Sequence, residues 1–169
     1  MANVKQISAG ALTASDSTAR EELGVLRAES NGKEYRYIRN CGSRTLPKGS
    51  ALSFVLASAN TYKAWGSRPV GNTNIAGGKN APAGICVGTI RKGQYGWVQC
   101  RGNFLGTTLR TSISGPHYTG ARIGLASGVN SRNVRVLCTT NLMRREYAIG
   151  VSLATGSQTF LKGVHLYGF

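Results

Sequence analysis

The stretch Ala83-Gly-Ile-Cys-Val-Gly-Thr-Ile-Arg-Lys-Gly-Gln-Tyr-Gly-Trp-Val-Gln-Cys-Arg-Gly102 carries the clearest structural pattern in the chain. Two apolar runs, rich in β-branched and aromatic residues, flank Arg91-Lys92-Gly93-Gln94. This pattern is typical of a β-hairpin closed by a short loop that contains glycine. The sequence therefore predicts a hairpin over residues 83–102, and the rest of the chain is interpreted around it.

The two faces of this hairpin differ in character. If the hairpin is centred on Gly93, Cys86 lies opposite Cys100, and the even-numbered residues form a small, apolar face that we predict to be core. The odd-numbered face carries Tyr95 and Trp97 among polar and cationic residues, and we interpret it as a surface for a partner. The alternative is that Trp97 covers a second core layer, since large aromatic side chains are usually mostly buried.

Composition favours an all-β fold. The 169 residues suit a single domain, and 23 glycines with only 16% charged residues fit a turn-rich β protein better than a helical one. Candidate strands separated by turn residues occur at residues 25–29, 34–39, 51–56, 121–126, 133–138, 146–153 and 159–169, and neither face of residues 34–39 is cleanly apolar. We expect residues 25–29 and 34–39 to form a second hairpin with a type I′ turn at Asn31-Gly32, and residues 103–118 to be irregular. The pattern predicts a sandwich, jelly roll or barrel of about eight to ten short strands.

The N-terminus is predicted to be an arm, residues 1–24, in front of a single β domain, residues 25–169. Residues 1–15 are small and polar with sparse apolar positions. Asp16 is a suitable N-cap for a short helical turn over residues 17–23, and Gly24 suits its left-handed end. An arm of this kind can become ordered on a partner.

Charge is the second strong signal. The formal net charge is +15, and five of the six acidic residues lie before residue 35. Such a chain is attracted to polyanions or to an acidic protein surface, and the association weakens as salt rises. A solvated surface that keeps the protein soluble is the alternative. Apart from Arg91-Lys92 and Arg144-Arg145 the basic residues are scattered singly, so no nucleic-acid-binding motif emerges.

The sequence contains no recognisable catalytic or metal-binding pattern. The four cysteines lack ligand spacing, and we expect buried free thiols at Cys86 and Cys100. The two histidines lie outside known catalytic motifs, and Glu146 is the only carboxylate after residue 34. No apolar run approaches the ~20 residues that cross a bilayer. We therefore expect no enzyme activity, no cofactor, no metal and no membrane insertion.

A resemblance to a known family rests on three runs of sequence. Gly93-Gln-Tyr-Gly-Trp-Val-Gln-Cys-Arg-Gly102, the preceding Ala83-Gly-Ile-Cys-Val-Gly88, and Thr18-Ala-Arg-Glu-Glu-Leu-Gly-Val25 leading to Tyr35–Arg39 resemble small structural proteins of tailed-bacteriophage head modules. That group resembles capsid decoration, or cement, proteins, which are β-rich modules often assembled as trimers. The likeness covers roughly residues 1–105, and the strong positive charge and the cysteines depart from the family pattern.

The resemblance implies a structural protein of the virion. It would be assembled in the host cytoplasm, lie on the capsid surface as a homo-trimer, and stabilise the shell by bridging neighbouring major capsid protein subunits. We expect contacts with capsid or neighbouring subunits at Asn3, Val4, Lys5, Ile7, Asp16, Arg91, Tyr95, Trp97, Arg144 and Arg145. Two alternatives stay open: another virion β module, such as a tail or fibre component, and a basic nucleic-acid-binding protein with stacking aromatics beside Arg91.

Overall fold

The computed structural model describes residues 12–42, 44–54, 67–69, 82–110, 122–125, 134–136, 148–153 and 160–167. In these ranges the chain is built from antiparallel strands, and helical residues are limited to 12 and 13. The predicted all-β class is therefore confirmed. The strands are β1 (Leu26–Ala28), β2 (Glu34–Arg39), β3 (Ala51–Phe54), β4 (Ser67–Pro69), β5 (Pro82–Cys86), β6 (Tyr95–Arg110), β7 (Arg122–Leu125), β8 (Val134–Val136), β9 (Ala148–Ser152) and β10 (Phe160–Tyr167).

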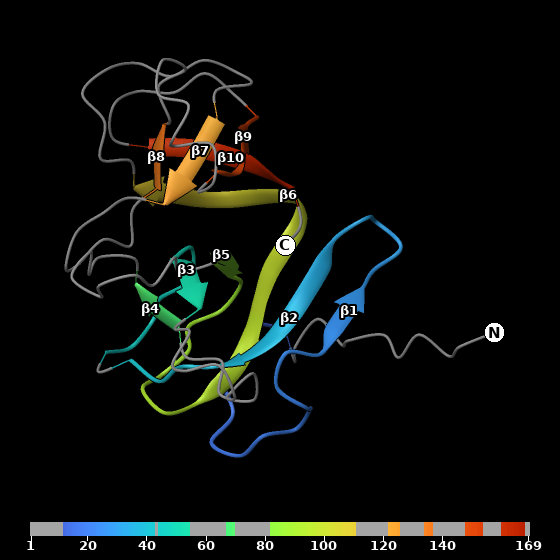
Figure 1. Cartoon of the computed structure of the whole chain (residues 1–169), viewed down its shortest axis with the longest axis vertical. Helices are drawn as coiled ribbons and strands as arrows, with labels where there is room; N and C mark the ends of the chain where they lie inside the picture. The colour runs from blue at the N-terminus through green and yellow to red at the C-terminus, as the bar shows by residue number, and fades with distance from the viewer. Residues whose placement is uncertain are drawn as a thin grey trace.

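Strand β6 connects the two parts of the sheet. Its first stretch pairs with β2 and β5, and its second stretch, from Arg101 onward, pairs with β10, beyond which lie β9, β7 and β8. Figure 1 shows β6 turning from a lower stretch beside β2 into an upper stretch beside β10. Gly102 follows the last residue that pairs with β2, and its φ of +84° is a conformation that glycine adopts without strain.

The register of the central hairpin differs from the prediction. Cys86 pairs with Val98, so the predicted pairing of Cys86 with Cys100 is wrong by two residues. The reason is that Ile90 leaves the hairpin and exchanges two backbone hydrogen bonds of 2.8 Å with Leu46. The predicted glycine turn is present, because the Gln94 amide donates to the Arg91 carbonyl at 3.1 Å around Gly93, whose φ is +76°.

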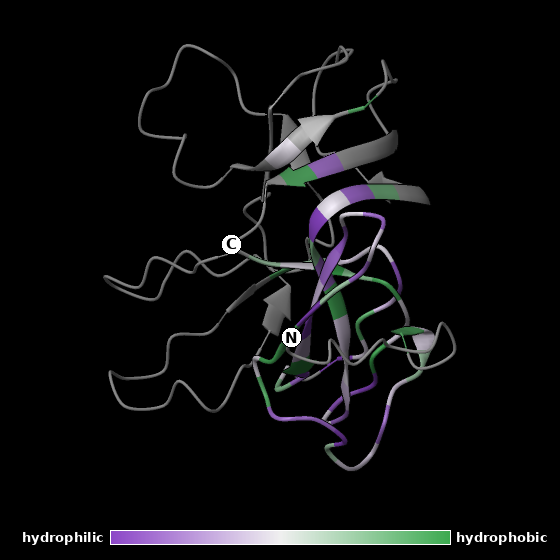
Figure 2. Cartoon of the chain, turned by 90° about the vertical axis from the view of Figure 1, so that its right-hand side faces the viewer, coloured by the Kyte–Doolittle hydropathy of each residue, from purple (hydrophilic) through white to green (hydrophobic). Residues whose placement is uncertain are grey.

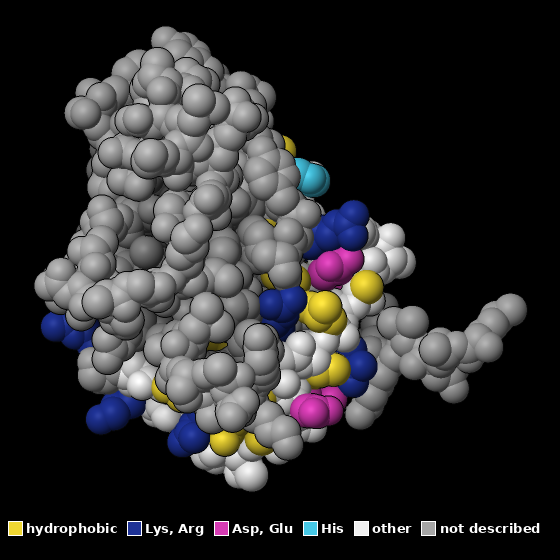
Figure 3. All heavy atoms as spheres, viewed as in Figure 1, with side chains coloured by type: hydrophobic (Ala, Val, Ile, Leu, Met, Phe, Trp, Pro, Cys, Tyr) yellow, Lys and Arg dark blue, Asp and Glu magenta, His cyan; other side chains and the backbone are white. Residues whose placement is uncertain are grey.

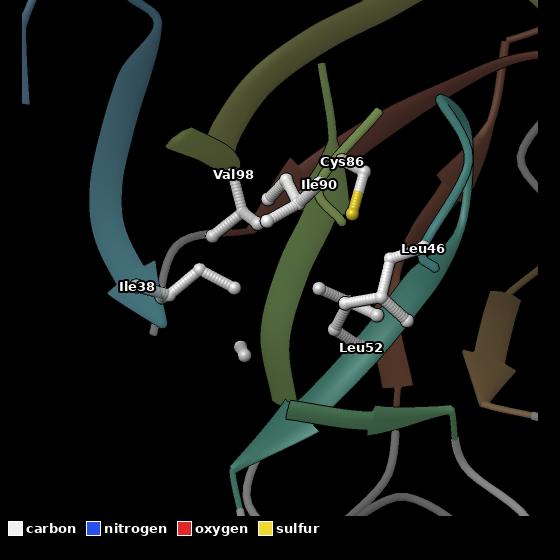
Figure 4. Close-up of a cluster of buried hydrophobic side chains, with 7 residues drawn as sticks. Ile38, Leu46, Leu52, Cys86, Ile90 and Val98 are labelled. Atoms are coloured by element: carbon white, nitrogen blue, oxygen red, sulfur yellow. The ribbon is translucent and has the colours of Figure 1, made fainter. Parts of the chain in front are cut away.

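The even-numbered face of the hairpin lies in the main core, as predicted. A shift of two residues leaves each side chain on its original face, because side chains alternate with a period of two. The buried cluster consists of Ile38, Leu46, Leu52, Ala83, Cys86, Ile90 and Val98. Figure 4 shows its labelled side chains converging from β2, β3, the central hairpin and their loops. Figure 2 shows the complementary pattern, with hydrophilic residues in the loops at the bottom of the molecule.

The odd-numbered face is covered by the chain itself. Trp97 is only 4% exposed and forms a second buried cluster with Tyr35 and Tyr37. Leu12 and Val25, near the two ends of residues 12–25, are among the apolar side chains that pack against this cluster. The interpretation of Trp97 as a partner-facing residue is therefore wrong, and the second core layer is the correct alternative.

Residues 12–25, here called the N-terminal segment, lie on the domain. Asp16 exchanges two backbone hydrogen bonds with Tyr95, of 3.0 and 2.9 Å, and the Gly24 amide donates to the Tyr37 carbonyl at 2.8 Å. Residues 17–23 form bends and a turn, so the predicted helical turn capped by Asp16 is wrong; bonds to β2 and β6 replace local helical ones. Gly24 has the expected positive φ, +85°. The first eleven residues of the predicted arm lie outside the described ranges.

The hairpin of β1 and β2 is confirmed, but its turn is longer than predicted. The Glu29 amide donates to the Lys33 carbonyl at 2.8 Å, and the Gly32 amide donates to the Glu29 carbonyl at 3.0 Å. The loop therefore spans residues 30–32, with Gly32 at a φ of +78°, in place of a two-residue type I′ turn. The Asn31 side chain stabilises it by accepting a hydrogen bond from the Lys33 amide at 3.0 Å.

The later strands β7 to β10 fall within the apolar runs that the sequence marks as strands. The exception is the segment after the central hairpin. Residues 103–110, predicted to be irregular, form the second stretch of β6 because β10, more than fifty residues later, pairs with them.

Candidate functional site

Two loops form one end of the molecule. Residues 40–50, between β2 and β3, and residues 87–94, between β5 and β6, are joined by the paired backbone bonds of Leu46 and Ile90. The Gly93 amide donates to the Asn40 carbonyl at 2.8 Å, and the Asn40 amide donates to the Gln94 carbonyl at 2.8 Å. These bonds make the two loops a single unit.

Exposed cations collect on this unit, which we call the basic end. Its exposed Lys and Arg residues, together with the last residue of β2, are Arg39, Arg44, Lys48, Arg91 and Lys92. Figure 3 shows Lys and Arg side chains at the lower left, over the part of the molecule where Figure 1 places these two loops. No residue from 35 to 145 in the sequence is acidic. The basic end is therefore a region of positive potential.

Asn40 holds the basic end together. Its side chain is fully buried, and its Nδ2 donates to the carbonyls of Arg44 and Ile90 at 2.8 and 3.1 Å. Its Oδ1 accepts a hydrogen bond from the Gly42 amide at 3.0 Å. Sequence reasoning missed this residue, because Asn followed closely by glycine indicates a turn but does not indicate burial.

Arg39 is held at this end by a hydrogen bond and by a contact with an aromatic ring. It lies opposite Tyr95 in the β2–β6 pairing, with its Cζ 5.6 Å from the centre of the Tyr95 ring. Its Nε donates to the Gly93 carbonyl at 3.3 Å. Tyr95 in turn stacks beside Tyr37, with ring centres 6.1 Å apart, and Tyr37 contacts Trp97 at 5.0 Å. A row of aromatic rings thus leads from the buried cluster to the Arg39 guanidinium at the surface.

Four cations of the basic end, Arg39, Lys48, Arg91 and Lys92, form no ion pair with a carboxylate of the described residues. Arginines on other parts of the domain do form ion pairs: Arg20 with Asp16 at 2.9 Å, Arg27 with Glu21 at 3.0 Å and Arg101 with Glu34 at 2.9 Å. The charge of the four cations at the basic end remains available to a partner.

The structure brings three of the predicted contact residues together. Arg91 is exposed on the basic end, Tyr95 is partly exposed beside it, and the Asp16 backbone bridges to Tyr95. Trp97 lies below them in the second buried cluster. The remaining predicted contacts lie outside the described residues: Asn3, Val4, Lys5, Ile7, Arg144 and Arg145. Sequence reasoning missed Arg39, whose position depends on the pairing of β2 with β6.

The thiols of Cys86 and Cys100 are buried, and burial lowers their reactivity. Cys86 and Cys100 are free and buried, as expected, and Cys41 is free and exposed. Burial raises the pKa of the Cys86 thiol far above its usual range and also raises the pKa of Cys100. Both therefore stay protonated at neutral pH and are poor nucleophiles.

The described residues include a histidine contact at the surface, and they lack a cluster of metal ligands and a long apolar helix. The exposed His165 places its Nδ1 2.7 Å from the Asn103 Oδ1. In the described ranges, no three His, Cys, Asp or Glu side chains are grouped as metal ligands would be. No helix in this part of the chain is long and apolar enough to cross a membrane.

Comparison with protein-family models, with curated proteins and with solved structures finds no match to this chain.

Proposed function

We propose that the protein is a structural virion protein that binds the phage capsid and stabilises it by bridging neighbouring major capsid protein subunits. The observation that supports this proposal most is the basic end, where Arg39, Lys48, Arg91 and Lys92 are exposed on or beside two cross-bonded loops and pair with no carboxylate of the described residues. Such a surface is complementary to an acidic protein shell, and complementary charge gives specificity and rapid association. The likeness of residues 83–102 to phage head proteins supports the same class.

Stabilisation of a shell needs binding, and it does not need catalysis. A module that contacts two neighbouring subunits lowers the free energy of the assembled state relative to the separated subunits. Assembly of the protein as a trimer would combine several weak contacts into strong attachment. The finer architecture, a sandwich, jelly roll or barrel, stays a prediction.

The nucleic-acid alternative has less support. Trp97 is buried, and the Tyr95 ring has the Arg39 guanidinium over one face and stacks beside Tyr37, which leaves less ring surface on which a base could stack. Phosphate contacts by the exposed cations would remain, and these respond steeply to salt. A tail or fibre component remains the other alternative, because it too requires only a β module with a binding surface.

The test uses purified undecorated capsids of the phage that encodes the protein. We expect saturable co-sedimentation with them, weakened in the double variant Arg91→Ser/Lys92→Ser. The control is Lys33→Ser/Arg101→Ser, which removes the same charge at the other end of β2, about 20 Å away. Capsid binding that both double variants weaken equally would contradict a specific role of the basic end. If the wild-type protein ignores capsids and binds DNA, the nucleic-acid alternative replaces the proposal.

A further inference from the structure

We propose that the Arg39 guanidinium, held over Tyr95 at the basic end, is a binding site for a side-chain carboxylate of an acidic peptide segment. The inference rests on the proposed function, because it names the chemistry by which the basic end would recognise an acidic capsid surface. It assigns the central contact to Arg39, which lies outside the set of contacts that the sequence predicts.

The first argument is the orientation of the guanidinium. Its Nε is engaged with the Gly93 carbonyl, and the group lies over the Tyr95 ring. Arginine has five N–H donors in a planar fork, so four of them, on the two Nη atoms, remain for a ligand. Two parallel hydrogen bonds from such a fork match a carboxylate. Because the side chain is already ordered, less conformational entropy is lost on binding.

The second argument is the rigidity of the support. The Gly93 carbonyl belongs to the turn at residues 91–94, and the Gly93 amide is tied to Asn40, the neighbour of Arg39 on the chain. Arg91 and Lys92 precede Gly93 and are exposed, so they add positive potential at the same place. Backbone hydrogen bonds therefore hold the turn that supports the Arg39 guanidinium and that also carries Arg91 and Lys92.

The third argument is that no carboxylate of the described residues competes for this site. Asp16, whose backbone bridges to Tyr95, directs its carboxylate to Arg20 at 2.9 Å. Among the described residues no carboxylate pairs with Arg39. A single exposed ion pair adds little to the free energy of binding, whereas a bidentate pair supported by neighbouring charges adds more.

An acidic peptide fits this site better than a nucleic acid. Binding of single strands combines cations with open aromatic faces on which bases stack. Here Arg39 itself covers a face of Tyr95, and the next rings in the row, Tyr37 and Trp97, are buried. The site therefore offers hydrogen-bond donors and charge without an open stacking platform.

The experiment measures binding of a fluorescein-labelled oligoglutamate peptide by fluorescence anisotropy, with an oligothymidine of equal charge as the competing probe. Arg39→Lys keeps the charge but loses the planar fork, and we expect the affinity for the peptide to fall about tenfold. The control is Arg101→Lys, which changes an exposed arginine on β6, away from the basic end. This variant should bind the peptide as tightly as the wild type does. Thermal melting of each variant verifies the fold.

Two results would overturn the site. One is an Arg39→Lys variant that binds the peptide as tightly as the wild type, because charge alone would then explain the affinity. The other is tighter, Arg39-dependent binding of oligothymidine, which would assign the site to nucleic acid.

Capsid co-sedimentation of the same proteins separates this inference from the proposed function. Arg39-dependent peptide binding without capsid binding would support the carboxylate site and contradict the virion role. Capsid binding that is unaffected by Arg39→Lys would support the virion role and contradict the site.

Discussion

Gly88 and Gly96 matter because other parts of the chain approach them closely. A Cβ atom at Gly88 would overlap the backbone of Thr13 in the N-terminal segment. A Cβ atom at Gly96 would lie 2.8 Å from Cγ1 of Ile90. The absence of a side chain at Gly88 thus allows the segment to lie directly on the loop that follows β5, and the segment in turn covers Trp97.

Gly88→Ala is expected to displace the N-terminal segment. Overpacking of this kind costs about 1–3 kcal/mol, so urea unfolding should show a lower stability, and limited proteolysis should cut residues 12–16 faster. The control is Gly93→Ala, where the φ of +76° makes alanine strained but no atom lies within 4 Å of the added Cβ. That strain costs about 1 kcal/mol and leaves the segment in place. Equal cleavage rates in the two variants would contradict the docking of the segment on Gly88.

Trp97→Ala is expected to destabilise the domain by about 3–5 kcal/mol, because it leaves a cavity between β6 and the N-terminal segment. Chemical denaturation measures the loss of stability. Trp97→Phe should lose less stability than Trp97→Ala, because it retains an aromatic ring. A stable, normally folded Trp97→Ala variant that loses only partner binding would contradict the core role of Trp97 and support a role in partner contact.

Strands were predictable where the signal is local. The hairpin of β1 and β2, the short strand β3 and the strands β7 to β10 follow from apolar runs bounded by turn residues. The register of β5 against β6 could not be predicted from local sequence, because it depends on the bonds between Leu46 and Ile90, which are far apart in sequence. For the same reason β6 extends to Arg110 through Thr- and Gly-containing sequence that appears irregular by itself. Pairing with a distant strand overrode local preference in both cases.

The β1–β2 hairpin contains a pH-sensitive tyrosine. Burial, together with the charge of Glu29 and a hydrogen bond to it, raises the pKa of Tyr35 to about 12 from an ordinary value of 10.0. The unfolded chain therefore loses this proton near pH 10 while the folded chain keeps it. The stabilisation is complete below about pH 10 and is lost as the pH rises toward about 12.

Urea unfolding at several pH values tests this effect. We expect the stability of Tyr35→Phe to decline less steeply above about pH 10 than that of the wild type. The raised pKa of the buried Cys86 thiol produces an alkaline decline in both proteins, so the difference between them isolates Tyr35. Parallel declines would show that Tyr35 ionises alike in the folded and unfolded chains.

Charge is distributed unevenly over the protein. Five of the six carboxylates precede residue 35, and those of Asp16, Glu21 and Glu34 already pair with arginines. At the basic end, Arg39, Lys48, Arg91 and Lys92 are exposed and pair with no carboxylate of the described residues. Sequence alone identified Arg91 and Tyr95 there, because both belong to the central hairpin. It missed Arg39 and Asn40, since their positions depend on the pairing of β2 with β6 and on the contact between two loops.

The most direct test of the proposed virion role is the melting temperature of undecorated capsids, measured by calorimetry with and without saturating protein. We predict that the wild-type protein raises this temperature and that Arg91→Ser/Lys92→Ser raises it less at equal concentration, because weaker binding to the assembled shell gives less stabilisation. A shell that melts at the same temperature with and without the wild-type protein, under conditions where the protein itself is folded, would contradict a capsid-stabilising function.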